Sequence, residues 1–251
     1  MEASLVGSEM CIRDSVTRQL KINVIIKCLS MNKLLEIKNL SLSYKINNKS
    51  LQILKNVNID LNYKEAISVI GESGSGKTSL IMLIAGLEKF NSGELIFDGN
   101  NFKNLNEDEL SDIRRKNIGI IFQSFFLLPN FTALENVNLT LEINNINNGL
   151  NKSKEILDKV GLKHRFNHYP SQLSGGEQQR VAIARSLVMK PKLILADEPT
   201  GNLDKINSSL ISGILFDIVK DSGSSLILVT HDTKIANKAH KKIEINDGKI
   251  I

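Results

Sequence analysis

Apolar and polar residues follow two periods along this chain, one typical of strands and one typical of helices. Alternation, which is typical of strands with one buried face, covers Leu35–Leu42 and is strict over Val57–Leu61. A one-residue shift within the first stretch indicates a β-bulge. Continuous apolar runs, which are typical of buried parallel strands, occupy residues 66–70, 118–121, 193–196 and 226–229. Helical patterns lie between several of these runs, so the sequence predicts an α/β protein.

Further elements can be placed from the same pattern. We expect a strand at 93–99 and a charged helix at 106–116. Residues 142–153 are rich in Asn and Gly and are expected to form a surface loop, followed by a helix from 153 to 160. A hairpin about Asp247 and Gly248 is expected to close the chain.

The first thirty residues differ from the rest of the chain. Glu2–Ser15 resembles translated sequencing-adapter DNA, and a strand pattern begins soon after Met31. We therefore expect residues 1–30 to be a non-native or disordered extension and residues 31–251 to form a single domain, with a genuine N-terminal extension as the alternative. Both cysteines of the chain lie in this first segment, so we expect no disulfide or cysteine metal site, and a reducing compartment fits.

Composition excludes several classes of protein. The chain has 251 residues, of which 41% are hydrophobic, which is enough for one domain with a full core. The net charge of +5 is spread along the sequence, so no nucleic-acid partner is expected. The apolar runs are too short for a membrane-spanning helix, and no convincing signal peptide is present. If the protein acts at a membrane, we therefore expect it to do so through a partner protein.

A glycine-rich stretch between a strand and a helix carries the clearest chemistry. Residues 71–79 read Gly-Glu-Ser-Gly-Ser-Gly-Lys-Thr-Ser and match the phosphate-binding pattern G-x-x-x-x-G-K-[ST]. Backbone N–H groups at a helix start bind anions because the helix dipole favours negative charge there, and glycines let the main chain come close. We expect Lys77 to reach the β- and γ-phosphates of a nucleoside triphosphate and Thr78 to ligate Mg²⁺.

Acidic and imidazole side chains follow two other buried strands. Asp197 and Glu198 end one apolar run, and His231 follows the next. The carboxyl ends of parallel strands meet at one edge of a sheet, where α/β proteins bind ligands. We expect Asp197 to hold Mg²⁺ through water, Glu198 to act as general base toward the attacking water, and His231 to contact a γ-phosphate. Gln123 also ends a strand, which by itself is weak support for a site.

Three further features each allow two interpretations. Tyr44 closes the first strand, where its ring could stack on a purine or belong to the core. Ser174–Gly176 precedes an amphipathic helix at 181–187 and forms either a second anion-binding site or a plain serine N-cap. Two phosphate sites so far apart in one chain would favour a dimer. The apolar cluster Phe125–Phe131 is either subdomain core or a groove for a partner's helix.

These motifs, in this order, resemble the ATP-binding cassette (ABC) family of ATPases. The resemblance covers nearly everything from Leu35 onward and rests on the loop at 71–79, Gln123, Leu-Ser-Gly-Gly-Glu-Gln-Gln-Arg at 173–180, Leu-Ile-Leu-Ala-Asp-Glu at 193–198, Asn-Leu-Asp at 202–204 and His231. It implies an α/β P-loop NTPase fold: a mixed core sheet flanked by helices, an antiparallel β-subdomain, and an α-helical subdomain at about 124–187 that carries the signature.

The resemblance also implies a role for each motif. Tyr44 would stack on adenine, and Gln123 would complete the Mg²⁺ shell with Thr78. In the family, the signature Ser174–Gly176 binds the nucleotide held by a second subunit, so ATP lies inside a head-to-tail homodimer and Asp204 contacts across it. The family is an ATPase that uses ATP and Mg²⁺. The expected nucleotide-binding residues are Tyr44, Gly71, Glu72, Ser73, Gly74, Ser75, Gly76, Lys77, Thr78, Ser79, Ser174, Gly175, Gly176 and Asp204; the catalytic residues are Lys77, Gln123, Glu198 and His231; the metal ligands are Thr78, Gln123 and Asp197.

Two segments narrow the resemblance within the family. Residues 122–137 and 198–204 resemble the lipoprotein-releasing (LolD-type) group, although drug or peptide exporter (MacB-type) and cell-division (FtsE-type) ATPases share much of both. Lipoprotein release from the inner membrane is therefore the preferred interpretation, with an exporter ATPase or a cell-division regulator as alternatives. The resemblance implies transmembrane permease subunits that dock near Gln123 and Phe125–Phe131, and a peripheral location on the cytoplasmic face of the inner membrane.

Overall fold

A computed structural model describes residues 33–46 and 49–251 of the chain. The expected N-terminal extension at 1–30 and the expected start at Met31 lie outside the described residues. From Leu34 to Ile251 the chain forms one compact unit. Within the described ranges, the helices are too short or too polar to cross a membrane.

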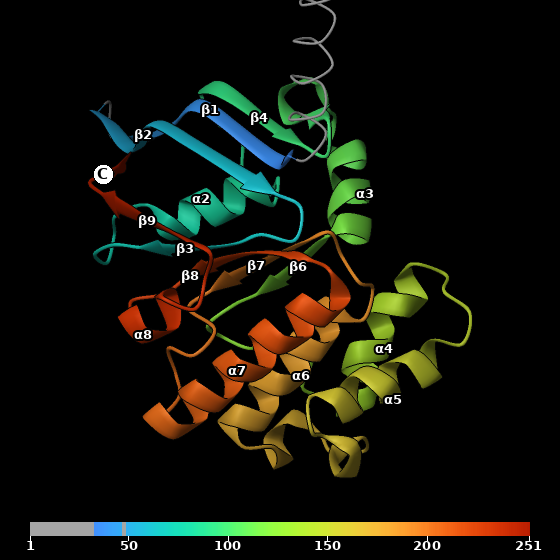
Figure 1. Ribbon diagram of the computed structural model, residues 1–251. Coiled ribbons are helices and arrows are strands. Elements are labelled where there is room, and N and C mark those ends of the chain that lie inside the picture. Colours follow the sequence, from blue (N-terminus) through green and yellow to red (C-terminus); the bar gives the residue numbers. More distant parts are fainter. Residues whose placement is uncertain (1–32, 47–48) are drawn as a thin grey trace, which may run out of the picture. The chain divides into compact units, whose positions relative to one another are not determined.

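A six-stranded sheet forms the centre of this unit, with strand order β10-β9-β3-β8-β7-β6 (Figure 1). Its strands are β3 (Ala66–Ile70), β6 (Ile118–Ile121), β7 (Leu193–Asp197), β8 (Ser225–Val229), β9 (Lys241–Asn246) and β10 (Lys249–Ile250). Neighbouring strands are parallel except β9 and β10, which form the expected hairpin. Nearly all residues of β3, β7 and β8 are buried, because helices or other strands cover both faces of the sheet; this explains their continuous apolar runs.

A second sheet has strand order β2-β1-β4-β5 and lies on one side of the first. Its strands are β1 (Lys33–Ile46), β2 (Lys49–Asn62), β4 (Ser92–Phe97) and β5 (Asn100–Asn101). The register of β1 against the antiparallel β4 shifts between Lys38 and Ser41, which confirms the expected bulge. The shift keeps Ile37 and Leu40 both buried, although they are an odd number of residues apart.

The described chain also forms seven helices and three short 3₁₀ helices. They are α2 (Lys77–Ile84), α3 (Glu107–Asn117), α4 (Ala133–Ile143), α5 (Gly149–Lys159), α6 (Gly175–Leu187), α7 (Lys205–Ser222), α8 (Thr233–Ala236), η1 (Phe102–Asn104), η2 (Lys163–Arg165) and η3 (Pro170–Gln172). Figure 1 shows α2 between the two sheets, and its buried residues share one core with both. A second core joins the opposite face of the six-stranded sheet to α4, α5, α6 and α7.

The helical layer differs from the sequence expectation in two places. The α4 helix was not expected, although Thr132 and Glu135 form a capping box at its start, a signal readable as T-x-x-E. The surface loop expected at 142–153 is wrong over its last five residues, because α5 begins at Gly149. Ser153 and Leu157 are buried and anchor α5 against the core, whereas the Asn and Gly residues that indicated a loop are confined to its start.

A polar cluster ties the two sheets together. Tyr63, which follows β2, donates a hydrogen bond to the carboxylate of Asp98, which follows β4. Asp98 also forms an ion pair with Lys192, which precedes β7. Burial and the neighbouring Asp98 raise the pKa of Tyr63 to about 12. The cluster therefore links the antiparallel sheet to the parallel one through one hydrogen bond and one ion pair.

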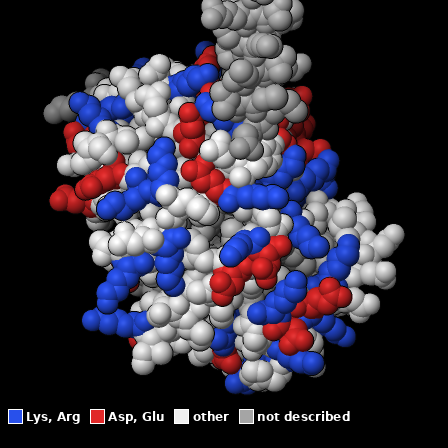
Figure 2. Space-filling model, viewed as in Figure 1, with Lys and Arg blue, Asp and Glu red and all other residues white. Residues whose placement is uncertain are grey.

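Charged side chains of both signs are intermixed over the face of the molecule shown in Figure 2. Lysine and arginine lie beside aspartate and glutamate over most of that face. In the described chain, ion pairs on α3 join Arg115 to Asp112 and Arg114 to Glu107. The net charge is thus spread rather than gathered into a stripe on this face.

Candidate active site

Three parallel strands end side by side at the carboxyl edge of the six-stranded sheet. Val69 of β3 pairs with Val229 of β8, and the same Val229 pairs with Asp197 of β7. The residues after each strand therefore leave the sheet at one place. These are the phosphate loop after β3, Glu198 after β7 and His231 after β8, as expected from the sequence.

The backbone of the phosphate loop requires glycine at three positions, one of which is Gly71, where a Cβ would lie 2.1 Å from the Ile245 carbonyl oxygen. Gly74 and Gly76 have φ angles of 80° and 101°, in the left-handed region that favours glycine. A Cβ at Gly76 would also lie 2.9 Å from the Leu54 side chain. Gly76 is the N-cap of α2, and no side chain caps the first-turn N–H groups. Those donors are left to bind an anion.

Two polar side chains of the loop are buried. Nζ of Lys77 donates hydrogen bonds to the carbonyl oxygens of Gly71 at 2.9 Å and Glu72 at 2.6 Å. Oγ of Ser75 is buried and has no hydrogen-bond partner among the described residues. A buried hydroxyl without a partner costs about 1–3 kcal/mol, a loss that a phosphate oxygen would remove. The loop therefore fits the phosphate groups of a nucleotide.

Thr78 and Asp197 meet across the site. The Thr78 hydroxyl donates a hydrogen bond of 2.9 Å to Oδ2 of Asp197. Burial, and to a smaller extent the charge of Glu198, raises the pKa of Asp197 above its usual value, while the Thr78 hydrogen bond and Lys77 oppose this rise. A carboxylate that burial destabilises gains most from a nearby cation, and a hydroxyl beside a carboxylate is an oxygen ligand set that suits Mg²⁺. The residues present therefore fit the expected metal.

Glu198 and His231 form a second pair at the same edge. Nδ1 of His231 lies 2.6 Å from Oε2 of Glu198. Glu198 has a φ of 46°, a left-handed conformation that non-glycine residues adopt at a cost of order 1 kcal/mol or more. Its backbone N–H bonds to the Val229 carbonyl, so the strained turn is fixed to β8. Strain of this kind is often kept where it aims a functional side chain.

Gln123 is held at the site by a partner that the sequence did not reveal. Its Nε2 donates to Oδ1 of Asn202 at 3.1 Å, and Nδ2 of Asn202 donates back to the Gln123 carbonyl at 3.1 Å. A Cβ at Gly201 would lie 2.8 Å from Nε2 of Gln123, so this approach needs the glycine. The reciprocal bonds fix the connection after β6 to the turn after β7.

Tyr44 lies at the end of β1 with its ring 39% exposed, so it is not the fully buried core tyrosine of the alternative interpretation. Its hydroxyl donates a hydrogen bond to Glu88, which follows α2. That bond to a carboxylate, with a smaller effect of burial, raises the pKa of Tyr44. Glu88 therefore fixes the aromatic ring relative to the helix that begins with the phosphate loop.

The second glycine motif lies at the start of α6, and a residue outside the motif stabilises it. Ser174 is the N-cap, its hydroxyl accepts from the Glu177 N–H, and the Glu177 carboxylate accepts from the Ser174 N–H at 2.8 Å. Arg165 donates to the same carboxylate at 2.8 Å. The capping box was readable as S-x-x-E, whereas the arginine was not. In the described chain, no hydrogen bond or ion pair joins Ser174–Gly176 to the phosphate loop.

Asp204 has a local role within this chain. Its Oδ1 accepts hydrogen bonds from the N–H groups of Ile206 and Asn207, so it caps the start of α7. Its expected contact across a dimer stays a prediction. Asn207 also lies beside the signature, because a Cβ at Gly176 would be 3.3 Å from its Oδ1.

Two side chains with no role assigned from the sequence, Arg185 and Asn136, hold the segment after Gln123. Arg185 of α6 donates to the carbonyl oxygens of Phe126 at 2.7 Å and Phe125 at 3.0 Å. The buried Asn136 of α4 donates to the carbonyls of Leu128, Phe131 and Thr132 and accepts from the Leu128 N–H. Sequence reasoning missed both residues, since nothing local marks a side chain that bonds to a distant backbone.

Comparison with known proteins decides the family of this chain. The sequence profile of the family described as ABC transporter matches residues 54–201, more than half of the chain. The chain belongs to the ABC transporter family. The expected ABC fold is thereby confirmed, with its mixed core sheet, its antiparallel sheet and its helical layer.

Curated relatives and solved structures of ABC cassettes cover most of the chain. The protein named lipoprotein-releasing system ATP-binding protein LolD is 42% identical in Wigglesworthia glossinidia brevipalpis and 43% identical in Francisella tularensis, over 86% of this chain and 95–96% of theirs. The dimeric ABC cassette MJ0796 bound to ADP and Pi superposes with a TM-score of 0.79 at 38% identity, over 86% of this chain and 96% of that one. A second dimeric structure of MJ0796 gives a TM-score of 0.80 at 39% identity.

Proposed function

We propose that this ABC cassette hydrolyses ATP to energise membrane partner subunits, and that the system releases lipoproteins from the inner membrane. The single observation that carries the lipoprotein assignment is the identity of 42–43% to proteins named LolD over 86% of the chain. An ATPase of this kind would lie on the cytoplasmic face of the membrane and reach it through its partners.

The arrangement at the carboxyl edge supports a role for each side chain. The amides of residues 71–76 and Lys77 would bind the phosphates, and Tyr44 would stack on the adenine. Thr78, Gln123 and Asp197 would hold Mg²⁺, which when bound supplies positive charge to the transferring phosphoryl group. Glu198 would take the proton of the attacking water as general base, and His231, at 2.6 Å from Glu198, would orient that carboxylate and contact the γ-phosphate.

Two chains would complete each site. The signature residues Ser174–Gly176 present backbone N–H groups at the start of α6, a second place for a phosphate. A head-to-tail dimer would bring the signature of one chain to the phosphate loop of its partner, with Asp204 at the boundary. The dimeric form named for the MJ0796 structures supports this arrangement.

The segment after Gln123 supports a docking site for a membrane subunit. Phe126 is 65% exposed and Leu128 is 41% exposed, so two large apolar side chains meet solvent there. Phe122 packs edge-to-face on Phe126 with ring centroids 5.2 Å apart. A helix of the partner that docks on Phe125–Phe131 would act on a backbone that Arg185 and Asn136 already hold to α6 and α4.

Affinity capture tests the proposed system. The chain, tagged and expressed with its neighbouring genes, would be captured from native membranes and its companions identified by mass spectrometry. We expect a pair of lipoprotein-release-type membrane subunits, each with few spans and a large periplasmic domain. A drug-exporter or cell-division membrane subunit instead would leave the ATPase assignment intact and overturn lipoprotein release.

The contact of Tyr44 with Glu88 leads to a prediction about nucleotide affinity. Changing Glu88 to Ala should weaken ATP binding about 3- to 10-fold, because the ring loses its anchor to the segment after α2. Changing Glu88 to Gln should restore most of the affinity, since its amide oxygen still accepts the hydrogen bond. Fluorescent-nucleotide titration measures both, with the exposed neighbour Lys89→Ala as control. Unchanged affinity in Glu88→Ala would remove Glu88 from this positioning role.

A further inference from the structure

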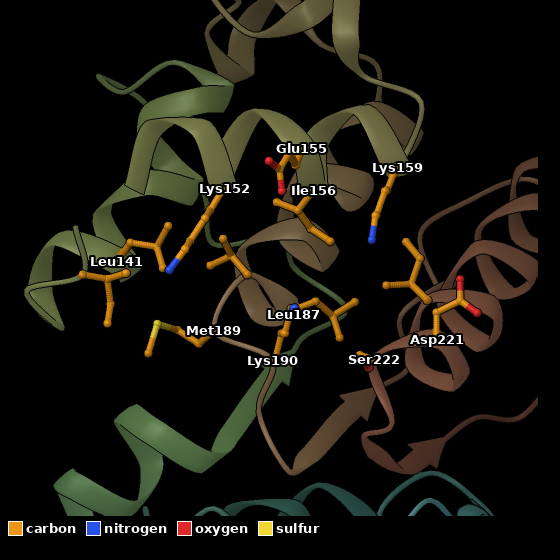
Figure 3. Close-up of a pocket in the computed structure, with 13 residues that line it drawn as sticks. Leu141, Lys152, Glu155, Ile156, Lys159, Leu187, Met189, Lys190, Asp221 and Ser222 are labelled. Carbon is orange, nitrogen blue, oxygen red and sulfur yellow. The ribbon is translucent and has the colours of Figure 1, made fainter. Parts of the chain in front are cut away.

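A hollow of about 400 Å³ lies among the helices, lined by α4, the loop after α4, α5, the end of α6 and the end of α7 (Figure 3). None of its lining residues belongs to the candidate active site or to the segment 122–137, apart from their shared helices. Its volume falls in the range of small-molecule sites, about 300–1,000 Å³, and is small for a docked protein helix.

The floor of the hollow is apolar. Leu141, Leu187, Val188 and Ile218 are almost fully buried and line it together with the half-buried Met189. These side chains come from three different helices and the connection after α6, so the surface is formed by packing and not by one flexible segment. An alkyl body in this place would remove its own apolar surface from water against these side chains, a gain that grows with the area covered.

Positive charge lies over this apolar floor. Lys152 and Lys159 are seven residues apart on α5, on the same face of the helix as Ile156. Figure 3 shows both amino groups reaching from α5 toward the hollow, whereas the Glu155 carboxylate stays beside the α5 ribbon. Lys152 and Lys159 form no ion pair with the described residues. Lys190 adds a third ammonium group to the lining, against the carboxylates of Glu155 and Asp221.

We propose that this hollow binds an amphipathic monoanion, a molecule with an alkyl body and a single carboxylate or comparable headgroup. The apolar floor would take the alkyl body. Lys152 and Lys159 lie about two helical turns apart on α5, so one of the two would bind the headgroup, depending on the orientation of the ligand. The lining holds three lysines against two carboxylates, so its net charge favours an anion over a cation of the same shape. This ligand would be independent of ATP, since no residue of the hollow contacts the nucleotide site.

Titration of the full-length protein with two ligands of the same alkyl length and opposite charge tests the proposal. Decanoate should bind in calorimetry, and decyltrimethylammonium, with the same alkyl length and the opposite charge, should bind at least tenfold more weakly. The variants Lys152→Met and Lys159→Met keep the apolar stem and should each weaken decanoate binding about twofold, and the double variant should weaken it about fivefold. Lys154→Met, on the same helix but outside the lining, is the control and should not change it.

The outcomes separate the possibilities. Equal binding of decanoate and decyltrimethylammonium would overturn the charge-selective site. Undiminished decanoate binding in the double variant Lys152→Met/Lys159→Met would overturn it as well. Retained ATP binding in that double variant shows that it is folded. Flotation with phosphatidylcholine vesicles that contain oleate, compared with vesicles that lack it, distinguishes a membrane-borne anion from a free one. Binding to neither decanoate nor oleate vesicles would overturn the proposal.

Discussion

Replacing Glu198 with Gln should abolish ATP turnover while ATP binding persists. The amide keeps the size of the side chain and can still reach His231, but it cannot take a proton from water, and loss of a general base lowers rates by about 10²–10⁴-fold. ATP then stays in place, and the dimer that encloses it should accumulate. Phosphate release measures the turnover, and size-exclusion chromatography with ATP measures the dimer.

Two further variants make this result specific. Glu94→Gln removes an exposed carboxylate of β4 far from the carboxyl edge of the parallel sheet and should leave turnover unchanged. His231→Ala removes the partner of Glu198 and should also lower turnover, since the carboxylate loses the contact that orients it. If Glu198→Gln hydrolysed ATP at the normal rate, Glu198 would not be the base and another group near Asp197 would have to activate water.

Placing an arginine at Ser174 should block hydrolysis without blocking nucleotide binding to the single chain. Ser174 is exposed at the start of α6, so the longer side chain meets solvent in the monomer and obstructs only a nucleotide presented by a second chain. The matched control is Ser171→Arg, at an exposed serine three residues earlier. Loss of binding as well as hydrolysis would point to misfolding instead of an obstructed signature.

Mixing variants tests whether the site is shared between two chains. Lys77→Ala should remove nucleotide binding, because Lys77 is the buried cation of the phosphate loop. Neither Ser174→Arg nor Lys77→Ala should hydrolyse ATP alone. In a mixed dimer, however, one site combines the intact phosphate loop of the Ser174→Arg chain with the intact signature of the Lys77→Ala chain. Recovered activity is the expected outcome; mixed dimers that form but stay inactive would contradict a head-to-tail site.

The predictions share one physical argument. The three strands β3, β7 and β8 end in register, so residues far apart in sequence arrive at one edge with little freedom to move apart. A backbone hydrogen bond fixes Glu198 to β8, and a side-chain hydrogen bond joins Thr78 to Asp197. Positioning of this kind is what phosphoryl transfer needs, because the protein contributes mainly placement and charge.

Sequence alone was enough for features set by neighbouring residues. The phosphate loop was predictable because its glycines, Lys77 and Thr78 follow one another directly between a strand and a helix. The bulge in β1 was predictable because it moves the apolar period by one position. Asp197, Glu198 and His231 could be assigned to one edge because parallel strands, once recognised, end on the same side.

Only the tertiary structure decided contacts between distant segments. Asn202 forms hydrogen bonds with Gln123, from which it is 79 residues away in the sequence. The hydrogen bond between Tyr44 and Glu88 joins residues 44 positions apart, and that between Arg185 and Phe125 joins residues 60 positions apart. The early start of α5 was also missed, since burial of Ser153 and Leu157 overrides the loop-forming residues before them. The helix α4 was missed although its capping box is local. A local pattern records the period and termini of one element. Which side chains then meet, and where a hollow remains, depends on how several elements pack, and no single stretch of sequence encodes that.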